Sequence, residues 1–167
     1  MLELDPALAR NVYDLSKVLG ENLCLNFSSG KACVARLSNV FDADEAASGF
    51  LSELLTQARR SHEITSPVSP SGGRDYIHVT DAVSGLLAMA TGDVRGIVNI
   101  AGGRTILNGE LADVFSRSGH HLTLTGKAVP TVQPHCDISR LKKLGVTPKD
   151  AVTIIAEIMA RPDFLIV

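Results

Sequence analysis

Arg74-Asp75-Tyr76-Ile77-His78-Val79-Thr80-Asp81 carries the clearest secondary-structure pattern in this chain. Its first six residues alternate between polar and apolar side chains, which predicts a half-buried strand. Tyr76 and His78 would share one face of that strand, opposite Ile77 and Val79. A hydroxyl at Thr80 is then expected to cap a helix that runs to about residue 91. A strand that passes directly into a helix is the repeating unit of α/β folds.

Strands and helices continue to alternate on both sides of this stretch. Before it, we expect a helix over 5–26, a buried strand over 32–41, a helix over 44–60 and a loop over 66–73. After it, we expect a strand over 96–103, a helix over 108–119, a strand over 121–125, a proline-bearing stretch over 129–134, and helices from about 137 and 147. The pattern predicts an α/β fold class in one domain.

Composition excludes some function classes. The chain has 167 residues, is 45% apolar and 20% charged, and carries a formal charge of -2. No strongly basic patch stands out, so we expect no nucleic-acid partner. The chain contains neither a signal-peptide pattern nor an apolar run long enough to span a bilayer, so we expect a cytoplasmic protein with no membrane partner.

The cysteines and histidines indicate no metal centre. Three cysteines, Cys24, Cys33 and Cys136, lack CxxC spacing. We interpret them as core thiols in a reducing compartment. The histidines have no partners at metal-ligand spacing, so we expect no metal site.

A Tyr-x-x-x-Lys pair in the first predicted helix indicates acid–base chemistry. Tyr13 and Lys17 lie four residues apart and therefore share one helix face. In that geometry the ammonium can stabilise a phenolate, and such a tyrosine can act as a general base. The alternative interpretation is a solvated surface pair without a catalytic role.

Five stretches together resemble a known family, and they occur in its order. Tyr13 to Lys17 resembles its Y-x-x-x-K helix, 34–41 its R-x-x-N-V-Y-G, 74–81 its R-D-Y-I-H-V-x-D, 97–103 its Y-N-I-G-x-G, and 137–148 its closing D-x-S-K-A-x-x-x-L-G-x-x-P. The chain thus resembles the C-terminal half of an extended short-chain dehydrogenase/reductase of the NAD-dependent sugar epimerase/dehydratase family, similar to UDP-glucose 4-epimerase. The match at 74–81 is the most specific.

The resemblance implies roles for four residues in NAD- or NADP-dependent hydride transfer. As a phenolate, Tyr13 would remove a proton from a sugar hydroxyl, and Lys17 would stabilise that phenolate and bind the nicotinamide ribose. Asn39 matches a residue near the substrate, and Arg74 matches an arginine that contacts the phosphate of a nucleotide sugar.

Simpler roles compete with the two binding assignments. Arg74 could pair with Asp75 or another carboxylate, and Asn39 could cap a turn at the end of a strand. The polar residues that surround them, Asp75, Tyr76, His78 and Asp81, are expected to brace the fold.

Parts of the family pattern are missing from the chain. It contains no glycine-rich dinucleotide fingerprint, no Ser/Thr partner upstream of Tyr13, and Asp42 in place of the glycine after N-V-Y. We therefore expect a partial Rossmann-like unit over 1–43 joined to the small α/β substrate-binding part over 44–167, without the N-terminal dinucleotide-binding half. The strand over 32–41 would then be an uncovered edge, which predicts a homo-oligomer or association with a separate Rossmann half.

Two functions remain open from the sequence. The chain could be a truncated or split nucleotide-sugar epimerase/dehydratase that is inactive alone. Alternatively, it could be a non-catalytic remnant that binds a nucleotide sugar or a protein partner.

Overall fold

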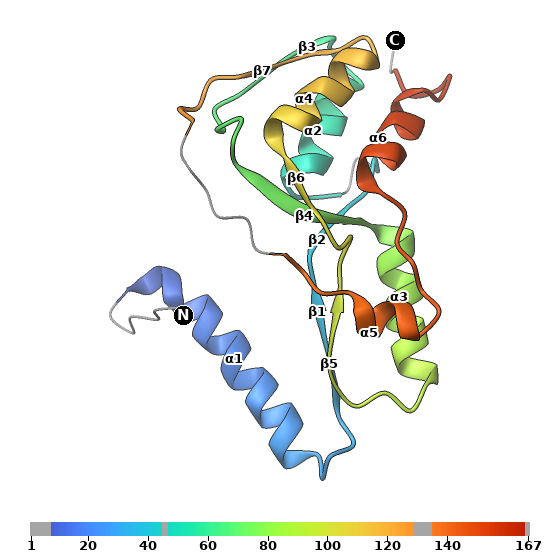
Figure 1. The fold of residues 1–167 in the computed structure, drawn as a ribbon. Coiled ribbons are helices and arrows are strands. Elements are labelled where there is room, and N and C mark those ends of the chain that lie inside the picture. Colours follow the sequence, from blue (N-terminus) through green and yellow to red (C-terminus); the bar gives the residue numbers. More distant parts are fainter. Residues whose placement is uncertain (1–7, 45–46, 129–134, 166–167) are drawn as a thin grey trace.

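The computed structural model describes residues 8–44, 47–128 and 135–165 (Figure 1). Its elements are, in chain order, α1 (Ala9–Phe27), β1 (Cys33–Leu37), β2 (Asn39–Phe41), α2 (Phe50–Ala58), β3 (Glu63–Ser66), β4 (Gly73–His78), α3 (Val79–Thr91), β5 (Gly96–Ile100), β6 (Thr105–Leu107), α4 (Asn108–Arg117), β7 (His121–Leu124), α5 (Ser139–Lys143) and α6 (Ala151–Met159). The α/β fold class predicted from the sequence is confirmed. Among the described helices, none is long and apolar enough to cross a bilayer.

Strand β4 is the centre of the fold. It lies between β2, which runs parallel to it, and β6, which runs antiparallel. Tyr76 packs into an apolar cluster formed with α2, α4 and α6, whereas Ile77 packs into a second cluster with α3 and β5. The strand is therefore covered on both faces, so the prediction of a half-buried strand is wrong for its central residues. The prediction that Tyr76 and Ile77 occupy opposite faces is correct.

The cap of α3 differs from the prediction. The helix begins at Val79, and its N-cap residue is His78 rather than Thr80. His78 Nδ1 accepts a hydrogen bond from the backbone N–H of Thr80 over 3.4 Å and lies 2.8 Å from the Thr80 hydroxyl. An imidazole nitrogen can replace the usual capping oxygen because it offers the same lone pair.

The predicted strand over 32–41 is two short strands that belong to different sheets. It breaks at Ser38, so that β1 pairs in parallel with β5, and β2 pairs in parallel with β4. The prediction that it is buried on both faces is wrong, because Cys33, Arg36 and Leu37 are exposed. Within the described residues, β1 pairs with one strand, β5. An apolar strand sequence predicts neighbours on both sides, but it does not say whether both belong to the same chain.

Helix α1 stands beside β1, away from the two apolar clusters (Figure 1). It ends where predicted, because Ser29 and Gly30 adopt left-handed conformations with φ of 53° and 73°. Arg36 Nε donates a hydrogen bond to Glu21 Oε1 over 2.7 Å, which ties the helix to β1. The predicted first turn at Asp5 lies outside the described residues.

The cysteine prediction is wrong for two residues. Cys24 on α1 and Cys33 on β1 are exposed, and Cys136 is half-buried. Cys24 and Cys33 occur in apolar segments, but those segments lie at the part of the fold that the described chain leaves uncovered.

Several element boundaries also differ. Helices α2, α5 and α6 begin a few residues later than predicted, and the sequence reading missed β3 and β6. The stretch over 129–134 lies outside the described residues. The predictions for 96–103, 108–119 and 121–125 correspond to β5, α4 and β7.

Candidate functional site

A small cavity lies where β1 passes into β2 beside the start of β4. Its volume is about 230 Å³, and it is lined by Ser38, Asn39, Gly73, Arg74, Asp75, Thr105 and Cys136. Parallel pairing places Asn39 opposite Tyr76, and antiparallel pairing places Arg74 opposite Ile106. The sheet therefore brings Asn39 and Arg74 together, although 34 residues separate them in the sequence.

Asn39 links two strands. Its Nδ2 donates a hydrogen bond to the backbone oxygen of Asp75 over 2.9 Å. The alternative interpretation, a cap of a turn at the strand end, is therefore wrong. This hydrogen bond uses the donor end of the amide, and the carbonyl end has no donor partner within the described ranges.

Arg74 carries the positive charge of the cavity. Its guanidinium carbon lies 5.6 Å from the ring centroid of Phe50, an arrangement in which the cation faces the aromatic ring. It forms no ion pair with a carboxylate in the part of the chain that the structure describes. The alternative interpretation, a pair with Asp75, is therefore wrong.

Asp75 holds the loop after β5 in place. Its Oδ1 accepts a hydrogen bond from Gly102 N over 2.7 Å, and its Oδ2 accepts one from Gly103 N over 2.8 Å. Asp81 acts similarly, because its Oδ2 accepts a hydrogen bond from Lys149 N over 2.9 Å. Asp75 therefore attaches the loop after β5 to β4, and Asp81 attaches the segment at Lys149 to α3.

Tyr76 is a buried residue of β4. The side chain is 2% exposed, and its hydroxyl has no hydrogen-bond partner among the residues described. Burial raises the pKa of Tyr76, with Arg74 acting in the opposite direction. The neutral phenol therefore packs as part of the core.

Tyr13 and Lys17 lie on α1 and do not line the cavity. Lys17 Nζ is 5.0 Å from the centroid of the Tyr13 ring, so the two side chains do share one helix face as predicted. Tyr13 is 66% exposed. The described chain therefore brings together Asn39 with Arg74, and Tyr13 with Lys17, as two separate pairs.

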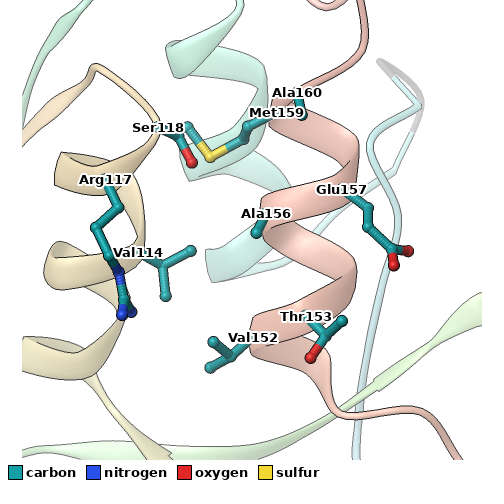
Figure 2. Close-up of a pocket in the computed structure, with 9 residues that line it drawn as sticks. All are labelled: Val114, Arg117, Ser118, Val152, Thr153, Ala156, Glu157, Met159 and Ala160. Atoms are coloured by element: carbon teal, nitrogen blue, oxygen red, sulfur yellow. The ribbon is translucent and has the colours of Figure 1, made fainter.

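A larger groove lies elsewhere, between α4 and α6 (Figure 2). Its volume is about 730 Å³, and apolar side chains such as Val114, Val152 and Met159 form much of its wall. Arg117 and Glu157 stand on the opposing helices at its rim. None of the residues predicted from the sequence lines it, so we place the candidate site in the smaller cavity.

Besides Asp75, which was expected to brace the fold, four residues that line the cavity were not predicted from the sequence: Ser38, Gly73, Thr105 and Cys136. Ser38 immediately precedes Asn39, so its position in the motif was a usable signal. Thr105 and Cys136 come from a strand and a segment that no local sequence pattern relates to β4.

The paired glycines Gly102 and Gly103 do not offer free N–H groups to a pyrophosphate. Pyrophosphate binding needs free backbone N–H groups, usually at a glycine-rich turn before a helix. The N–H groups of Gly102 and Gly103 are engaged by Asp75 instead. Among the described residues, no three His, Cys, Asp or Glu side chains cluster closely enough to hold a metal ion.

This chain spans about half to three-fifths of the length of the solved structures that it matches. RMD from Pseudomonas aeruginosa complexed with NADPH is similar with a TM-score of 0.70 and 18% identity, over 93% of this chain and 59% of that one. dTDP-glucose 4,6-dehydratase from Bacillus anthracis in complex with NAD has a TM-score of 0.69 and 16% identity, over 93% and 52%. UDP-glucuronic acid 4-epimerase from Bacillus cereus in complex with UDP-glucuronic acid and NAD has a TM-score of 0.65 and 20% identity, over 93% and 51%.

No curated protein matches the chain. The model of the NAD dependent epimerase/dehydratase family matches residues 1–101, which is more than half of the sequence. The chain therefore belongs to the NAD dependent epimerase/dehydratase family.

Proposed function

We propose that this chain is the C-terminal, substrate-binding part of a nucleotide-sugar epimerase or dehydratase. The observation that carries the proposal is the cavity shared by Asn39 and Arg74. A guanidinium that pairs with no carboxylate among the described residues suits a phosphate group, because its planar fork can hold two oxygens at once. The amide oxygen of Asn39 can accept a hydrogen bond from a hydroxyl of the ligand.

In this proposal, residues 1–43 are the remnant of the Rossmann part and residues 44–167 form the substrate-binding part. Tyr13 and Lys17 belong to the first of these and are the proposed catalytic and cofactor-contacting residues. NAD or NADP would supply the hydride chemistry, but a second component must provide the pyrophosphate site. The 66% exposure of Tyr13 supports this, because a general base works in a site that excludes water.

A second function, binding without catalysis, is favoured by a separate observation. The N–H groups of Gly102 and Gly103 already donate hydrogen bonds to Asp75. The Tyr13–Lys17 pair also does not line the cavity of Asn39 and Arg74. A remnant that binds a nucleotide sugar would retain Arg74 and would not depend on Tyr13.

Calorimetric titration of the purified chain with UDP-glucose tests the binding proposal. We expect UDP-glucose to bind, and Arg74→Ala to weaken its affinity at least tenfold because the cation is lost. Arg95→Ala is the matched control, since that exposed arginine lies outside the cavity. Absence of UDP-glucose binding, or equal effects of both variants, would contradict the proposal.

A titration with NAD tests whether the chain alone can bind the cofactor, which neither of the two proposed functions expects. We expect no NAD binding by the chain alone. Restored turnover upon addition of the N-terminal Rossmann half of a family member, lost in Tyr13→Phe, would support the split enzyme. Binding of UDP-glucose without turnover in that mixture would support the remnant.

A further inference from the structure

Glu21 and Arg36 form a two-point ion pair between α1 and β1. Arg36 Nε donates a hydrogen bond to Glu21 Oε1 over 2.7 Å, and Arg36 Nη2 donates one to Glu21 Oε2. The hydrogen bond from Arg36 lowers the pKa of the Glu21 carboxyl, so both partners are charged near pH 7. Because the guanidinium fork and the carboxylate are both planar, the two hydrogen bonds fix orientation as well as distance.

On α1, Glu21 continues the row of Tyr13 and Lys17. The three residues follow one another at four-residue spacing, so they lie one turn apart along one side of the helix. Leu25, one turn after Glu21, is half-buried, whereas Leu23 is exposed. The side of α1 that faces β1 is therefore the side that carries Glu21 and Leu25.

On β1, Arg36 is connected to the cavity through hydrogen-bonded backbone. The strand pairs with β5 along its whole length. The backbone N–H of Ser38 then donates a hydrogen bond to the oxygen of Ile100 over 3.0 Å. Asn39 Nδ2 donates one to the backbone oxygen of Asp75 over 2.9 Å. The short path from Arg36 to Asn39 is thus held by the sheets on both sides of the break at Ser38.

The turn between α1 and β1 is the point about which α1 can pivot. At about 1.5 Å per residue, Tyr13 stands about 20 Å along the helix from its last residue, Phe27. A pivot of about 20° would therefore displace Tyr13 by about 7 Å, whereas a misplacement of about 1 Å can already slow catalysis about a hundredfold. Since α1 belongs to neither apolar cluster, a contact away from the turn is needed to prevent the pivot.

We propose that Glu21 and Arg36 are positioning residues, which hold the Tyr13–Lys17 pair at a fixed place relative to the cavity that Asn39 lines. Neither Glu21 nor Arg36 lines that cavity, so the ion pair acts through Tyr13 and Lys17. This inference rests on the proposed function, because that function supplies the roles of Tyr13 and Lys17.

Pulsed electron paramagnetic resonance measures the position of α1 in the chain alone. Nitroxide labels are attached at Cys24 on α1 and at position 116 on α4, in a Cys33→Ser/Cys136→Ser/Ser116→Cys chain. The labelled chain is diluted with unlabelled protein, so that only distances within one copy are recorded. We expect a narrow distribution of the distance between the two labels.

Three variants of this labelled chain test the ion pair. Glu21→Gln, Arg36→Gln and the double variant should each broaden the distance distribution at least twofold. The broadening should be the same in all three, because either single substitution removes the whole pair. Asp14→Asn is the matched control, since this exposed carboxylate lies two turns before Glu21 on the same side of α1 and forms no ion pair among the described residues.

Turnover in the mixture with the N-terminal Rossmann half of a family member measures the consequence for catalysis. We expect Glu21→Gln and Arg36→Gln each to lower kcat at least tenfold and to change KM for UDP-glucose less than twofold, because Tyr13 is displaced while the cavity is intact. The double variant should be no slower than either single variant. Arg36→Lys, which keeps the charge but not the planar fork, should recover part of kcat.

The outcomes separate this inference from the proposed function. If the distance distribution stays equally narrow in all variants, or if Asp14→Asn broadens it as much, the inference is wrong, and UDP-glucose binding still decides the proposed function. If the distribution broadens but kcat does not fall, the positioning role is wrong. If the unmodified chain gives no turnover in the mixture, the catalytic role of Tyr13 and this inference are both wrong, whereas ligand binding at Arg74 is decided separately by calorimetry.

Discussion

Arg104 and Asp150 form a two-point ion pair that joins distant parts of the chain. Arg104 Nε lies 2.6 Å from Asp150 Oδ2, and its Nη2 lies 3.1 Å from Oδ1. Asp150 also caps α6 by accepting a hydrogen bond from Val152 N over 2.8 Å. Arg104 Nη1 reaches Glu110 on α4 over 2.8 Å. One guanidinium thus connects the segment before β6 with the first turns of α4 and α6.

This pair predicts a pH-dependent contribution to stability. The hydrogen bond from Arg104 lowers the pKa of Asp150 below its ordinary value. A lowered pKa means that the stabilisation is present above the ordinary value of about 3.9 and is lost as the pH falls below it. Both side chains are about 40% exposed, so we expect only about 1 kcal/mol. Urea unfolding should show Arg104→Ala less stable by that amount at pH 7, and the difference should shrink below pH 4.

Arg95→Ala provides the comparison for this measurement. Its partner Asp93 lies 3.4 Å away, and both side chains are more exposed than those of the Arg104 pair. We expect its free energy of unfolding to match that of the unmodified chain at both pH values. A difference between Arg104→Ala and the unmodified chain that does not change with pH would contradict the assigned role of Asp150.

Asp75→Asn should destabilise the loop after β5. An amide can accept only one of the two hydrogen bonds that Gly102 and Gly103 now donate, and its NH₂ group would face a second N–H. Asp75 is 8% exposed, so water cannot easily compensate. We expect a loss of about 2–3 kcal/mol in the free energy of unfolding, measured with urea. Asp93→Asn, at an exposed carboxylate, should be nearly neutral.

The sequence predicted most strongly where local pattern and burial agree. The alternation around Tyr76 and Ile77 correctly indicated a strand with opposite faces, and the Ser29-Gly30 signal correctly ended α1. The Tyr13 and Lys17 pair follows from helical spacing alone, and the structure reproduces it. These features depend on residues close together in the sequence.

Other features depended on contacts that no local pattern contains. The break at Ser38 arises because β1 and β2 find different partner strands, and burial of the 32–41 segment requires a neighbour that the described residues lack. Cys136 joins the cavity from a segment nearly a hundred residues after Asn39. The family motifs indicated Asn39 and Arg74 as separate residues. That they line one cavity follows from the pairing of β2, β4 and β6, which no local pattern predicts.

Gly102→Ala should be among the most damaging single substitutions. A β-carbon at this position would collide with the backbone oxygen of Tyr76, which cannot move without disturbing β4. We expect a loss of about 3 kcal/mol or more in the free energy of unfolding. Gly20→Ala is the matched control, because a β-carbon there meets nothing within 4 Å and alanine favours a helix by about 0.5–1 kcal/mol. Equal thermal stability of the two variants would contradict the steric argument.

The exposed face of α1 predicts association of the chain. Leu19, Leu23 and Phe27 follow one another at helical spacing and are 58%, 48% and 81% exposed. A row of apolar side chains on the surface of a helix favours burial against another protein surface. We therefore expect the chain to form a dimer or larger oligomer at micromolar concentration. Light scattering should show this, and Leu19→Lys/Leu23→Lys should shift the mass to that of a single chain. Asp14→Lys, on the opposite side of α1, should leave the mass unchanged. A single-chain mass for the unmodified protein would rule out self-association and leave a separate Rossmann half as the proposed cover for α1.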